Sequence, residues 1–586
     1  MRKVAVAALS VGLFRRLAIA AAALLVALLV AMPAAAQTAS PSAAAETRLS
    51  DAAIRQVLVQ RVDVDKQAAG IVVGVIDAKG RRVIARGVFD AADPRPVDGQ
   101  TLFEIGSVTK AFTGLLLADM VRRGEVTLDE PLVKLLPAGS VAPERNGKAI
   151  TLIDLATHTS GLPRLPDNMP MTDPLNPYAD YGPDLLDAFL RRYSLTRDVG
   201  AAYEYSNLGA GLLGRALAQR AGGDYETVLR KRVLAPLGMS STAIALSPAL
   251  EARFSPGHTA DLATTPHWDL PTLAGAGGLR SSADDLLKLL AAELGYVDTP
   301  LRAAMVGQLD PRRPVGGDVQ VALGWHVAAT PKGEIVSHGG GTMGFQTFVG
   351  FDQTSGVGVV VLSNASGAMG VEDLGLHLLT GAPLKTAPKV KVREAKTLPP
   401  IVLDGLTGRY ALGPGAVMAI TREGQRMFGQ LTGQPRIEIF AEGPTAFFTR
   451  VVDAQLTFTV GADGRASSVT LHQNGQNTPA PRLAEGAEPP AAPTPKVVAL
   501  SPQALDALVG RYALAPAMIL EVTRREGRLF AQLTGQPVFE VFPQSPTEVV
   551  WAVVPARAQF VLGADGKAIS LVLHQNGRAL PAPRVP

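Results

Sequence analysis

The last third of the chain contains one segment twice, and this repeat constrains the fold more than any other feature of the sequence. Four motifs occur in both copies, always 102 residues apart: LTGRYAL and LVGRYAL at Leu406 and Leu508, LTGQP at Leu431 and Leu533, GADG at Gly461 and Gly563, and LHQNG at Leu471 and Leu573. The copies therefore align without insertions. Such agreement indicates a duplicated structural module.

Each copy consists of short runs in which apolar and polar residues alternate, such as RLFAQL and AISLVLH. Alternation with a period of two is typical of half-buried strands. Turn signals separate the runs: Asp463-Gly464, Asn474-Gly475, Asp565-Gly566 and Asn576-Gly577. We therefore expect each copy to form a small antiparallel barrel or curled sheet of about eight strands, at residues 401–483 and 499–586.

Two segments poor in large apolar residues flank the first copy. KTAPKVKVREAKTLPP, residues 385–400, is basic and ends in prolines, and residues 484–498 include the Pro- and Ala-rich run AEGAEPPAAPTP. Such compositions are typical of semi-extended linkers.

The first 36 residues resemble a secretory signal peptide. Basic residues precede an apolar run from Leu17 to Met32, and Pro33-Ala34-Ala35-Ala36 follows it. The run has 16 residues, whereas a membrane-spanning helix needs about 20, so cleavage after Ala36 is favoured over a retained anchor. The chain has no cysteine, which excludes disulfides, thiolate zinc sites and a lipid-modified N-terminus. A soluble periplasmic protein is expected, with no membrane span after cleavage.

The net charge of +4 gives no indication of nucleic acid binding. Four basic residues of the leader account for it: Arg2, Lys3, Arg15 and Arg16. The remainder of the chain is therefore balanced, and no nucleic acid partner is expected.

Residues 49–384 have strand patterns at both ends and helix patterns between them. IVVGVID and RRVIARGVF open the region, and FQTFVGF and GVGVVVLSN close it. Helices are expected at 108–123, 183–192 and 208–221, and another begins at the capping signal Ser282-Ala283-Asp284-Asp285. This order predicts an α/β (α+β) domain with one antiparallel sheet, whose first and last segments pair and whose faces helices cover.

Ser107 and Lys110 lie three residues apart in FEIGSVTKAF, where the helix at 108–123 is expected to begin. The two side chains project from nearly the same face of the helix. One interpretation is that Ser107 caps the helix. The other is that Ser107 is a nucleophile and Lys110 is the cation or base beside it.

Two later segments contain further polar residues at the ends of expected elements. YEYSNLGAG contains Tyr205-Ser206-Asn207 before a helix, and VSHGGGTMGF contains His338 and the glycines 339–341 at a strand end. Glycines leaving a strand let a ligand approach the backbone and expose N–H donors.

These motifs, with LATHTSGLP, PLGM and GGLRSSADDL, resemble those of the serine β-lactamase and penicillin-binding superfamily in its class C-like branch. That branch includes class C β-lactamases, D-Ala-D-Ala carboxypeptidases, D-aminopeptidases and family VIII esterases. The resemblance covers residues 49–384 and implies a class C β-lactamase-like fold. The two repeats look like the barrel modules that follow this domain in some D-aminopeptidases and other S12 peptidases.

The resemblance also implies roles for individual residues. Ser107 would be the acylated nucleophile, and Tyr205 or Lys110 would take its proton. A phenol can serve as this base only if nearby cations depress its pKa. Backbone N–H groups of Ser107 and Gly341 would form an oxyanion hole. Asn207 would hold a substrate amide or the Lys110 ammonium, and His338 and Gly340 would belong to the substrate site.

One departure from the family pattern concerns the substrate. Many relatives have Lys-Thr-Gly where this chain has His338-Gly339-Gly340, and that lysine holds a substrate carboxylate. His338 is mostly neutral at pH 7. The change favours aminopeptidase, amidase or esterase substrates, although Arg280 or Arg164 are possible replacements for the lysine.

The sequence therefore predicts an exported serine acyl hydrolase that acts through a Ser107 acyl-enzyme. Its substrates would be small molecules or short peptides with amide bonds of the β-lactam or D-amino-acid class. A family VIII-type carboxylesterase and an inactive protein that binds cell-wall fragments are the alternatives. No cofactor or metal is expected, because the chain has no His-Glu-x-x-His motif and its eight histidines are scattered.

Overall fold

The computed structural model describes residues 48–585, except 171, 368, 387–392, 414–415, 433–435, 451–453, 474–475, 488–496, 516–517, 534–537, 553–555 and 576–577. The predicted signal peptide lies outside the described residues. So do the predicted turns Asn474-Gly475 and Asn576-Gly577 and parts of both predicted linkers.

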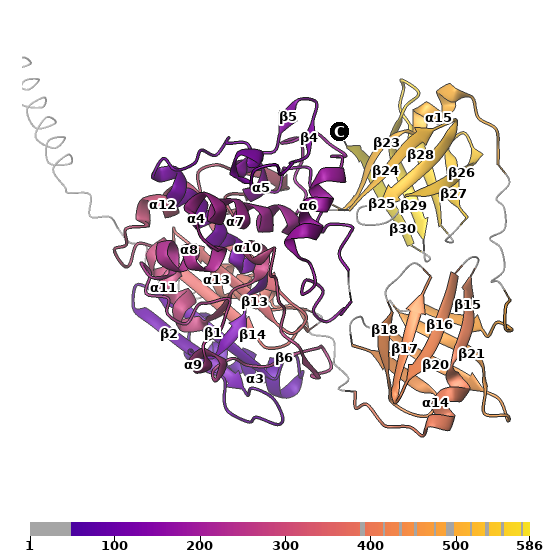
Figure 1. Cartoon of the computed structure of the whole chain (residues 1–586), viewed down its shortest axis with the longest axis horizontal. Helices are drawn as coiled ribbons and strands as arrows, with labels where there is room; N and C mark the ends of the chain where they lie inside the picture. The colour runs from indigo at the N-terminus through magenta and orange to yellow at the C-terminus, as the bar shows by residue number, and fades with distance from the viewer. Residues whose placement is uncertain are drawn as a thin grey trace, which may run out of the picture. The chain divides into compact units, whose positions relative to one another are not determined.

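An eight-stranded antiparallel sheet forms the framework of the N-terminal domain (Figure 1). Its strand order is β2-β1-β14-β13-β12-β11-β10-β9. Their bounds are β1 Gly70–Asp77, β2 Gly80–Gly87, β9 Arg313–Gly316, β10 Val319–Val321, β11 His326–Thr330, β12 Gly333–Gly341, β13 Gln346–Asp352 and β14 Val357–Ser363. The expected pairing of the first and last segments is confirmed, because β1 pairs with β14 in the register Val73↔Val361.

Helices cover both faces of this sheet. Adjacent residues of β1 alternate between two apolar cores, with Val72 in one and Val73 in the other, as the pleat of a strand requires. α11 (Ala283–Glu293) packs on one face of β1 and β14. α13 (Glu372–Thr380) and α3 (Asp51–Val59) pack on the other face. Ser282 caps α11 by accepting a hydrogen bond from Asp285 N–H, as the sequence predicts.

The larger core also holds the helical part of the domain, with α4 (Thr109–Arg122) at its centre. Every residue from Thr109 to Met120 is buried, so α4 is enclosed on all sides. It packs against α7 (Asn207–Ala221), α10 (Ala274–Gly277) and α12 (Arg302–Gln308). This burial fixes the residues at the start of α4 rigidly.

The remaining elements of the domain are short. They are η1 Gln60–Val64, β3 Leu102–Glu104, η2 Gly106–Val108, η3 Leu132–Leu135, β4 Glu144–Arg145, β5 Lys148–Ala149, α5 Leu152–Ala156, α6 Pro183–Arg192, α8 Tyr225–Leu229, η4 Arg230–Leu234, α9 Pro248–Glu251, β6 Gly257–His258, β7 Thr264–Thr265 and β8 Arg280–Ser282. None of the described helices is both long and apolar enough to cross a membrane.

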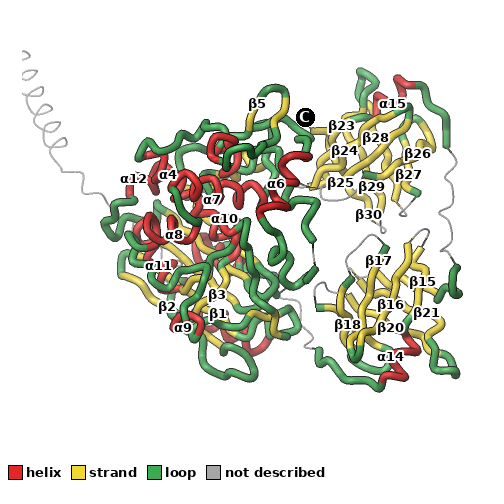
Figure 2. The backbone as a smooth tube through the Cα atoms, viewed as in Figure 1, coloured by secondary structure: helices red, strands yellow, loops and turns green. Residues whose placement is uncertain are grey.

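Each repeat forms eight antiparallel strands, as the sequence predicts (Figure 2). The first repeat contains β15 Gly408–Gly413, β16 Ala416–Glu423, β17 Arg426–Leu431, β18 Ile437–Ala441, β19 Ala446–Thr449, β20 Ala454–Val460, β21 Ala466–Gln473 and β22 Gln476–Pro481. The second contains β23 Gly510–Ala515, β24 Met518–Arg525, β25 Arg528–Leu533, β26 Phe539–Ser545, β27 Glu548–Trp551, β28 Ala556–Leu562, β29 Ala568–Gln575 and β30 Arg578–Val585. Pairing of β23 with β30 closes the second repeat into a barrel.

A short helix that the sequence analysis missed precedes each set of strands. These are α14 (Pro400–Leu406) and α15 (Pro502–Leu508). A fully buried tyrosine ties each helix to its barrel, since the Tyr410 hydroxyl donates to Leu406 O and the Tyr512 hydroxyl donates to Leu508 O. Both copies of the repeat therefore contain this short helix as well as the eight strands.

Part of the predicted linker 385–400 contacts the first repeat and is not a free spacer. Lys396 N–H donates to Ala441 O, and Arg393 forms an ion pair with Glu442 at 2.5 Å. The ordered structure of this repeat therefore begins before residue 401, where the sequence analysis places it.

Candidate active site

Ser107 lies in the 3₁₀ turn η2, directly before α4. The N-cap position of α4 is Val108 and no side chain caps the helix, so the capping interpretation of Ser107 does not describe this structure. The Ser107 side chain is partly exposed, and its Oγ accepts a hydrogen bond from Lys110 Nζ at 3.0 Å. Ser107 is thus both accessible and in contact with the proposed base.

Lys110 is buried beneath Ser107, with only 2% of its surface exposed. Its Nζ donates to Ser107 Oγ, to Asn207 Oδ1 at 2.9 Å and to the backbone oxygen of Ala276 at 2.7 Å. Burial, and secondarily the charge of Arg164, hold the pKa of Lys110 well below its usual range. The low pKa therefore favours the neutral amine form of Lys110 beside Ser107.

Tyr205 faces the same serine. Burial raises the pKa of its phenol to about 12, although a hydrogen bond with Ser107 and the charge of Arg164 act in the opposite direction. The Lys110 nitrogen lies 4.8 Å from the centre of the phenol ring. The condition for a phenol base is not met, because desolvation raises this pKa more than the charge of Arg164 lowers it. Tyr205 is protonated at neutral pH.

Asn207, the first residue of α7, connects that helix to α4. Its Oδ1 accepts from Lys110, and its Nδ2 donates to the hydroxyl of Tyr178 at 3.0 Å. Its backbone N–H donates to Arg164 O. The sequence analysis offered two partners for Asn207, a substrate amide and the Lys110 ammonium. The structure contains the contact with Lys110.

His338, expected at a strand end and in the substrate site, is buried in the structure. It is 4% exposed and lies within β12, where its Nδ1 donates to Gly339 O at 2.6 Å. Its ring centre is 5.1 Å from that of His326 and 6.3 Å from that of Tyr205. Burial, with the charges of His326 and Lys110, keeps the pKa of His338 well below its usual range. His338 is a buried neutral neighbour of the site.

The sequence suggested that the glycines after His338 leave the strand. In the structure they are the last three residues of β12. A Cβ at Gly340 would lie 2.1 Å from Ile105 O and 2.3 Å from Thr347 Oγ1. One at Gly106, whose φ is +48°, would lie 2.8 Å from Gly341 N. Bare backbone at these positions lets β12 approach the turn that carries Ser107.

Several neighbours of Tyr205 were not singled out from the sequence as site residues. Tyr203 OH and His326 Nε2 are 3.1 Å apart, and Tyr178 bonds to Asn207. His158 packs its ring on Tyr205 at 4.5 Å between ring centres. Its motif THTSGLP was the available signal, but spacing along the chain does not show which loop reaches a tyrosine 47 residues later.

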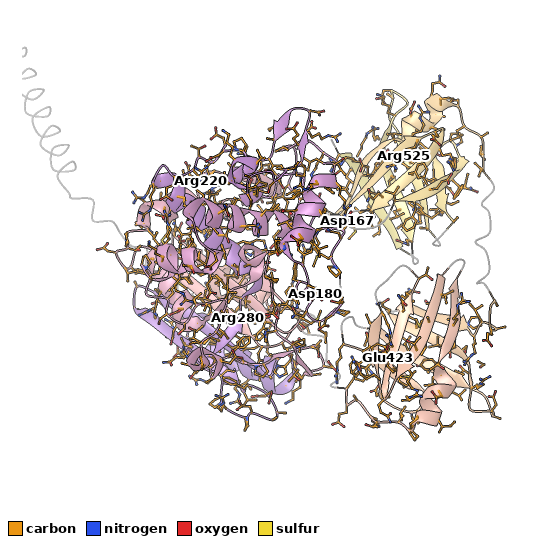
Figure 3. All side chains as sticks on the ribbon, viewed as in Figure 1. Asp167, Asp180, Arg220, Arg280, Glu423 and Arg525 are labelled. Carbon is orange, nitrogen blue, oxygen red and sulfur yellow. The ribbon has the colours of Figure 1, made fainter. Side chains whose placement is uncertain are left out.

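The two arginines considered as replacements for the family lysine differ in their surroundings. Arg280, labelled in Figure 3, is buried, and its guanidinium donates to the backbone oxygens of Ile244 and Trp268. It also lies 3.8 Å from Glu104 Oε1. Arg164 is exposed, and its Cζ lies 5.1 Å from the centre of the Tyr205 ring. Of these two arginines, only Arg164 lies beside Tyr205 with a guanidinium that is not bound to backbone oxygens.

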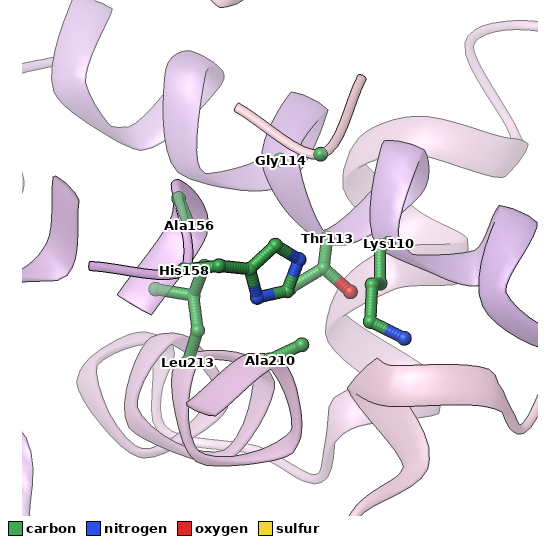
Figure 4. Close-up of a pocket in the computed structure, with 8 residues that line it drawn as sticks. Lys110, Thr113, Gly114, Ala156, His158, Ala210 and Leu213 are labelled. Carbon is green, nitrogen blue, oxygen red and sulfur yellow. The ribbon is translucent and has the colours of Figure 1, made fainter. Parts of the chain in front are cut away.

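A small cavity lies on the inner side of Lys110 (Figure 4). Its lining residues are Lys110, Thr113, Gly114, Ala156, His158, Ala210, Leu213 and Gly324. Its volume of ≈ 10 Å³ is enough for about one water molecule and far too small for a substrate. A substrate must therefore reach Ser107 from the exposed side.

Nothing in the described part of the chain resembles a metal centre, since no three His, Asp or Glu side chains there are grouped to hold an ion. The polar groups around Ser107 are a lysine, tyrosines, an asparagine and imidazoles. This arrangement suits acyl transfer through a nucleophile, a base and a hydrogen-bonded phenol.

The chain is similar in sequence to known proteins. The chain is 25% identical over 429 residues to "Penicillin-binding protein 4*" of Bacillus subtilis, which covers 68% of this chain and 91% of that protein. It is 30% identical over 331 residues to a β-lactamase of Escherichia coli K12, which covers 50% and 84%. A crystal structure of a β-lactamase/D-alanine carboxypeptidase from Yersinia pestis has 27% identity and a TM-score of 0.48, covering 54% of this chain and 94% of that one.

Family models account for most of the described residues. A domain of unknown function, DUF3471, matches residues 392–482 and again 494–582, the two repeats. The β-lactamase model matches residues 52–382, more than half of the chain. The chain belongs to the β-lactamase family, and this membership implies serine hydrolase activity.

Proposed function

We propose that this protein is an exported acyl hydrolase that forms an acyl-enzyme at Ser107 and cleaves amide bonds of the β-lactam or D-amino-acid peptide class. The observation that carries the proposal is the buried Lys110 nitrogen, 3.0 Å from the Ser107 hydroxyl. A serine hydroxyl becomes a useful nucleophile only beside a base that can take its proton.

The partners of Lys110 favour this lysine as the base. Two of its partners, Asn207 Oδ1 and Ala276 O, can only accept hydrogen bonds. The amide nitrogen of Asn207 is turned the other way and contacts Tyr178. Neutral Lys110 donates its two protons to them and directs its lone pair toward Ser107. The Ser107 proton then passes to Nζ while Oγ attacks the carbonyl carbon.

Tyr205 fits the role of a proton donor better than that of a base. Its phenol stays protonated and is hydrogen-bonded to Ser107. As the amide C–N bond breaks, Tyr205 supplies a proton to the leaving nitrogen and regains one from Lys110. The backbone N–H groups of Ser107 and Gly341 stabilise the negative charge on the carbonyl oxygen. Water then hydrolyses the ester at Ser107 and restores the enzyme.

Labelling by an active-site probe tests the proposal. Ser107→Ala should abolish turnover and covalent labelling by a fluorophosphonate or penicillin probe. Ser240→Ala, which changes an exposed serine outside the site, should leave both unchanged. If the Ser107→Ala variant is labelled as strongly as the wild type, Ser107 is not the nucleophile. If neither the wild type nor the Ser240→Ala variant is labelled or turns over substrate, the protein is inactive, and binding of cell-wall fragments by the wild type would then support the alternative of an inactive binding protein.

The second candidate is a carboxylesterase of family VIII type. The neutral His338, in place of the family's lysine, favours it because an ester lacking a carboxylate needs no fixed charge there. A panel separates the two: a chromogenic cephalosporin, D-alanine p-nitroanilide and a short-chain p-nitrophenyl ester, compared by kcat/KM. A preference for the ester by several orders of magnitude would favour the esterase.

Export is a separate part of the proposal. The basic and apolar leader ends in Pro33-Ala34-Ala35-Ala36, which supports cleavage after Ala36 and a periplasmic location. N-terminal sequencing of the mature protein should give Gln37 as the first residue. A mature chain that still begins at Met1 would contradict it.

A further inference from the structure

Arg164 has a fixed backbone and an uncommitted side chain. Its carbonyl oxygen accepts hydrogen bonds from the N–H groups of Asn207 and Leu208, which ties the loop to the start of α7. Its side chain is exposed, and its Cζ lies 5.1 Å from the Tyr205 ring centre. Across the residues that the structure describes, no carboxylate lies within ion-pairing distance of this guanidinium.

The other cationic groups near Ser107 cannot serve as a fixed external charge. Lys110 is buried and occupied by Ser107, Asn207 and Ala276. His338 is buried and His326 is half-buried, and desolvation lowers the pKa of both imidazoles. Arg280 is committed to backbone oxygens. Among the residues that the structure describes near Ser107, Arg164 is therefore the permanent positive charge that remains available.

The charge of Arg164 also acts on the groups around the nucleophile. It adds to the lowering of the pKa of Lys110 and His158, and it opposes the rise that burial causes in the pKa of Tyr178, Tyr203 and Tyr205. An anion that binds to Arg164 would thus sit within electrostatic reach of the serine and its base.

We propose that Arg164 determines specificity by binding a carboxylate of the substrate, from the loop before α7 and not from β12, where relatives carry their lysine. This inference rests on the proposed function and names the substrate class: acyl donors with a free carboxylate near the scissile amide. It selects Arg164 from the two arginines that the sequence offered as replacements for the family lysine. A guanidinium suits this role because its planar donors match a carboxylate bidentately.

A matched pair of substrates tests the proposal: a chromogenic cephalosporin as its free acid and as its neutral methyl ester. Arg164→Gln should lower kcat/KM for the acid by about 5- to 50-fold, the range for a partly exposed charged hydrogen bond, and leave the ester within about twofold. Arg164→Lys should restore part of the loss. Arg122→Gln, at the opposite end of α4, removes an exposed arginine about 18 Å along the helix from Lys110 and should change neither.

A binding measurement separates the failure of this inference from that of the proposed function. In the Ser107→Ala background, the Kd of the acid should rise on Arg164→Gln and the Kd of the ester should not. Equal changes for acid and ester, or no change for either, would overturn the role of Arg164. Turnover by the Ser107→Ala variant would overturn the proposed function. The role of Arg164 would then still be decided by the Kd values of the acid and the ester, with and without Arg164→Gln.

Discussion

His158 Nδ1 accepts a hydrogen bond from the backbone N–H of Ser206 at 3.1 Å. The carbonyl oxygen of His158 accepts from Glu204 N–H, and its ring packs on Tyr205, so three contacts hold the segment 204–206. Because Nδ1 accepts a hydrogen bond, the ring is neutral and carries its proton on Nε2. His158 has a left-handed backbone, with φ at +57°, an uncommon conformation for such a residue.

Two substitutions separate the contacts of His158. Asparagine adopts the left-handed conformation readily and places an acceptor near the position of Nδ1. Phenylalanine keeps a ring and leaves Ser206 N–H unsatisfied, at a cost of about 1–3 kcal/mol. We expect His158→Phe to lower kcat by about 10- to 100-fold with a smaller change in KM, and His158→Asn to retain most activity. If the loss of kcat merely follows the loss of thermal stability in both variants, His158 does not position Tyr205.

Gly340 and Gly339 provide a matched pair for the contact between β12 and the Ser107 turn. A Cβ at Gly340 would clash with the backbone oxygen of Ile105, whereas one at Gly339 would meet nothing closer than 3.8 Å. Gly340→Ala should therefore displace β12, lower the melting temperature and reduce kcat/KM by about 100-fold or more, because a displacement of about 1 Å is enough for that loss. Gly339→Ala should behave like the wild type in both measurements. Equal effects at the two positions would contradict this packing argument.

The pH dependence of acylation should report Lys110. Its pKa lies well below the usual 10.5 because the amine is buried. Lys110 acts as a base only when neutral, so kcat/KM should rise with pH through this depressed pKa and level off above it. Lys110→Arg keeps a positive charge that does not titrate below pH 12 and should reduce kcat/KM by about 1000-fold or more at every pH. An active Lys110→Arg variant with an unchanged profile would exclude Lys110 as the base.

Glu293 should make the protein less stable as the pH rises. Burial raises the pKa of this α11 carboxyl to about 8, and its Oε1 has no hydrogen-bond partner among the described atoms. Between pH 4.5 and about 8 the unfolded chain ionises at Glu293 and the folded chain does not, so the free energy of unfolding falls by on the order of 1.4 kcal/mol per pH unit.

Glu293→Gln removes this titration and should raise the melting temperature at pH 8 but not at pH 4.5. Glu334→Gln, at an exposed carboxylate paired with Arg312, should not produce this pattern. A stabilisation by Glu293→Gln that is the same at both pH values would show that the pKa of Glu293 is not raised in the folded protein.

The sequence by itself determined the features that repeat or follow a regular period. The 102-residue repeat predicted two eight-stranded modules, and period-two runs at both ends of residues 49–384 predicted the pairing of β1 with β14. The spacing of Ser107 and Lys110 along one helical turn also predicted their contact. These inferences work because they depend on backbone geometry, which a local pattern of residues fixes.

Only the tertiary structure decided the charge states of the site and the neighbours that set them. Whether Tyr205 is a base or an acid depends on burial, which raises its pKa more than nearby cations lower it. The burial of His338 and the exposure of Arg164 beside Tyr205 likewise follow from how distant loops and strands meet. Desolvation and through-space electrostatics depend on distances between segments that are remote in the chain, and these distances exist only once the chain has folded.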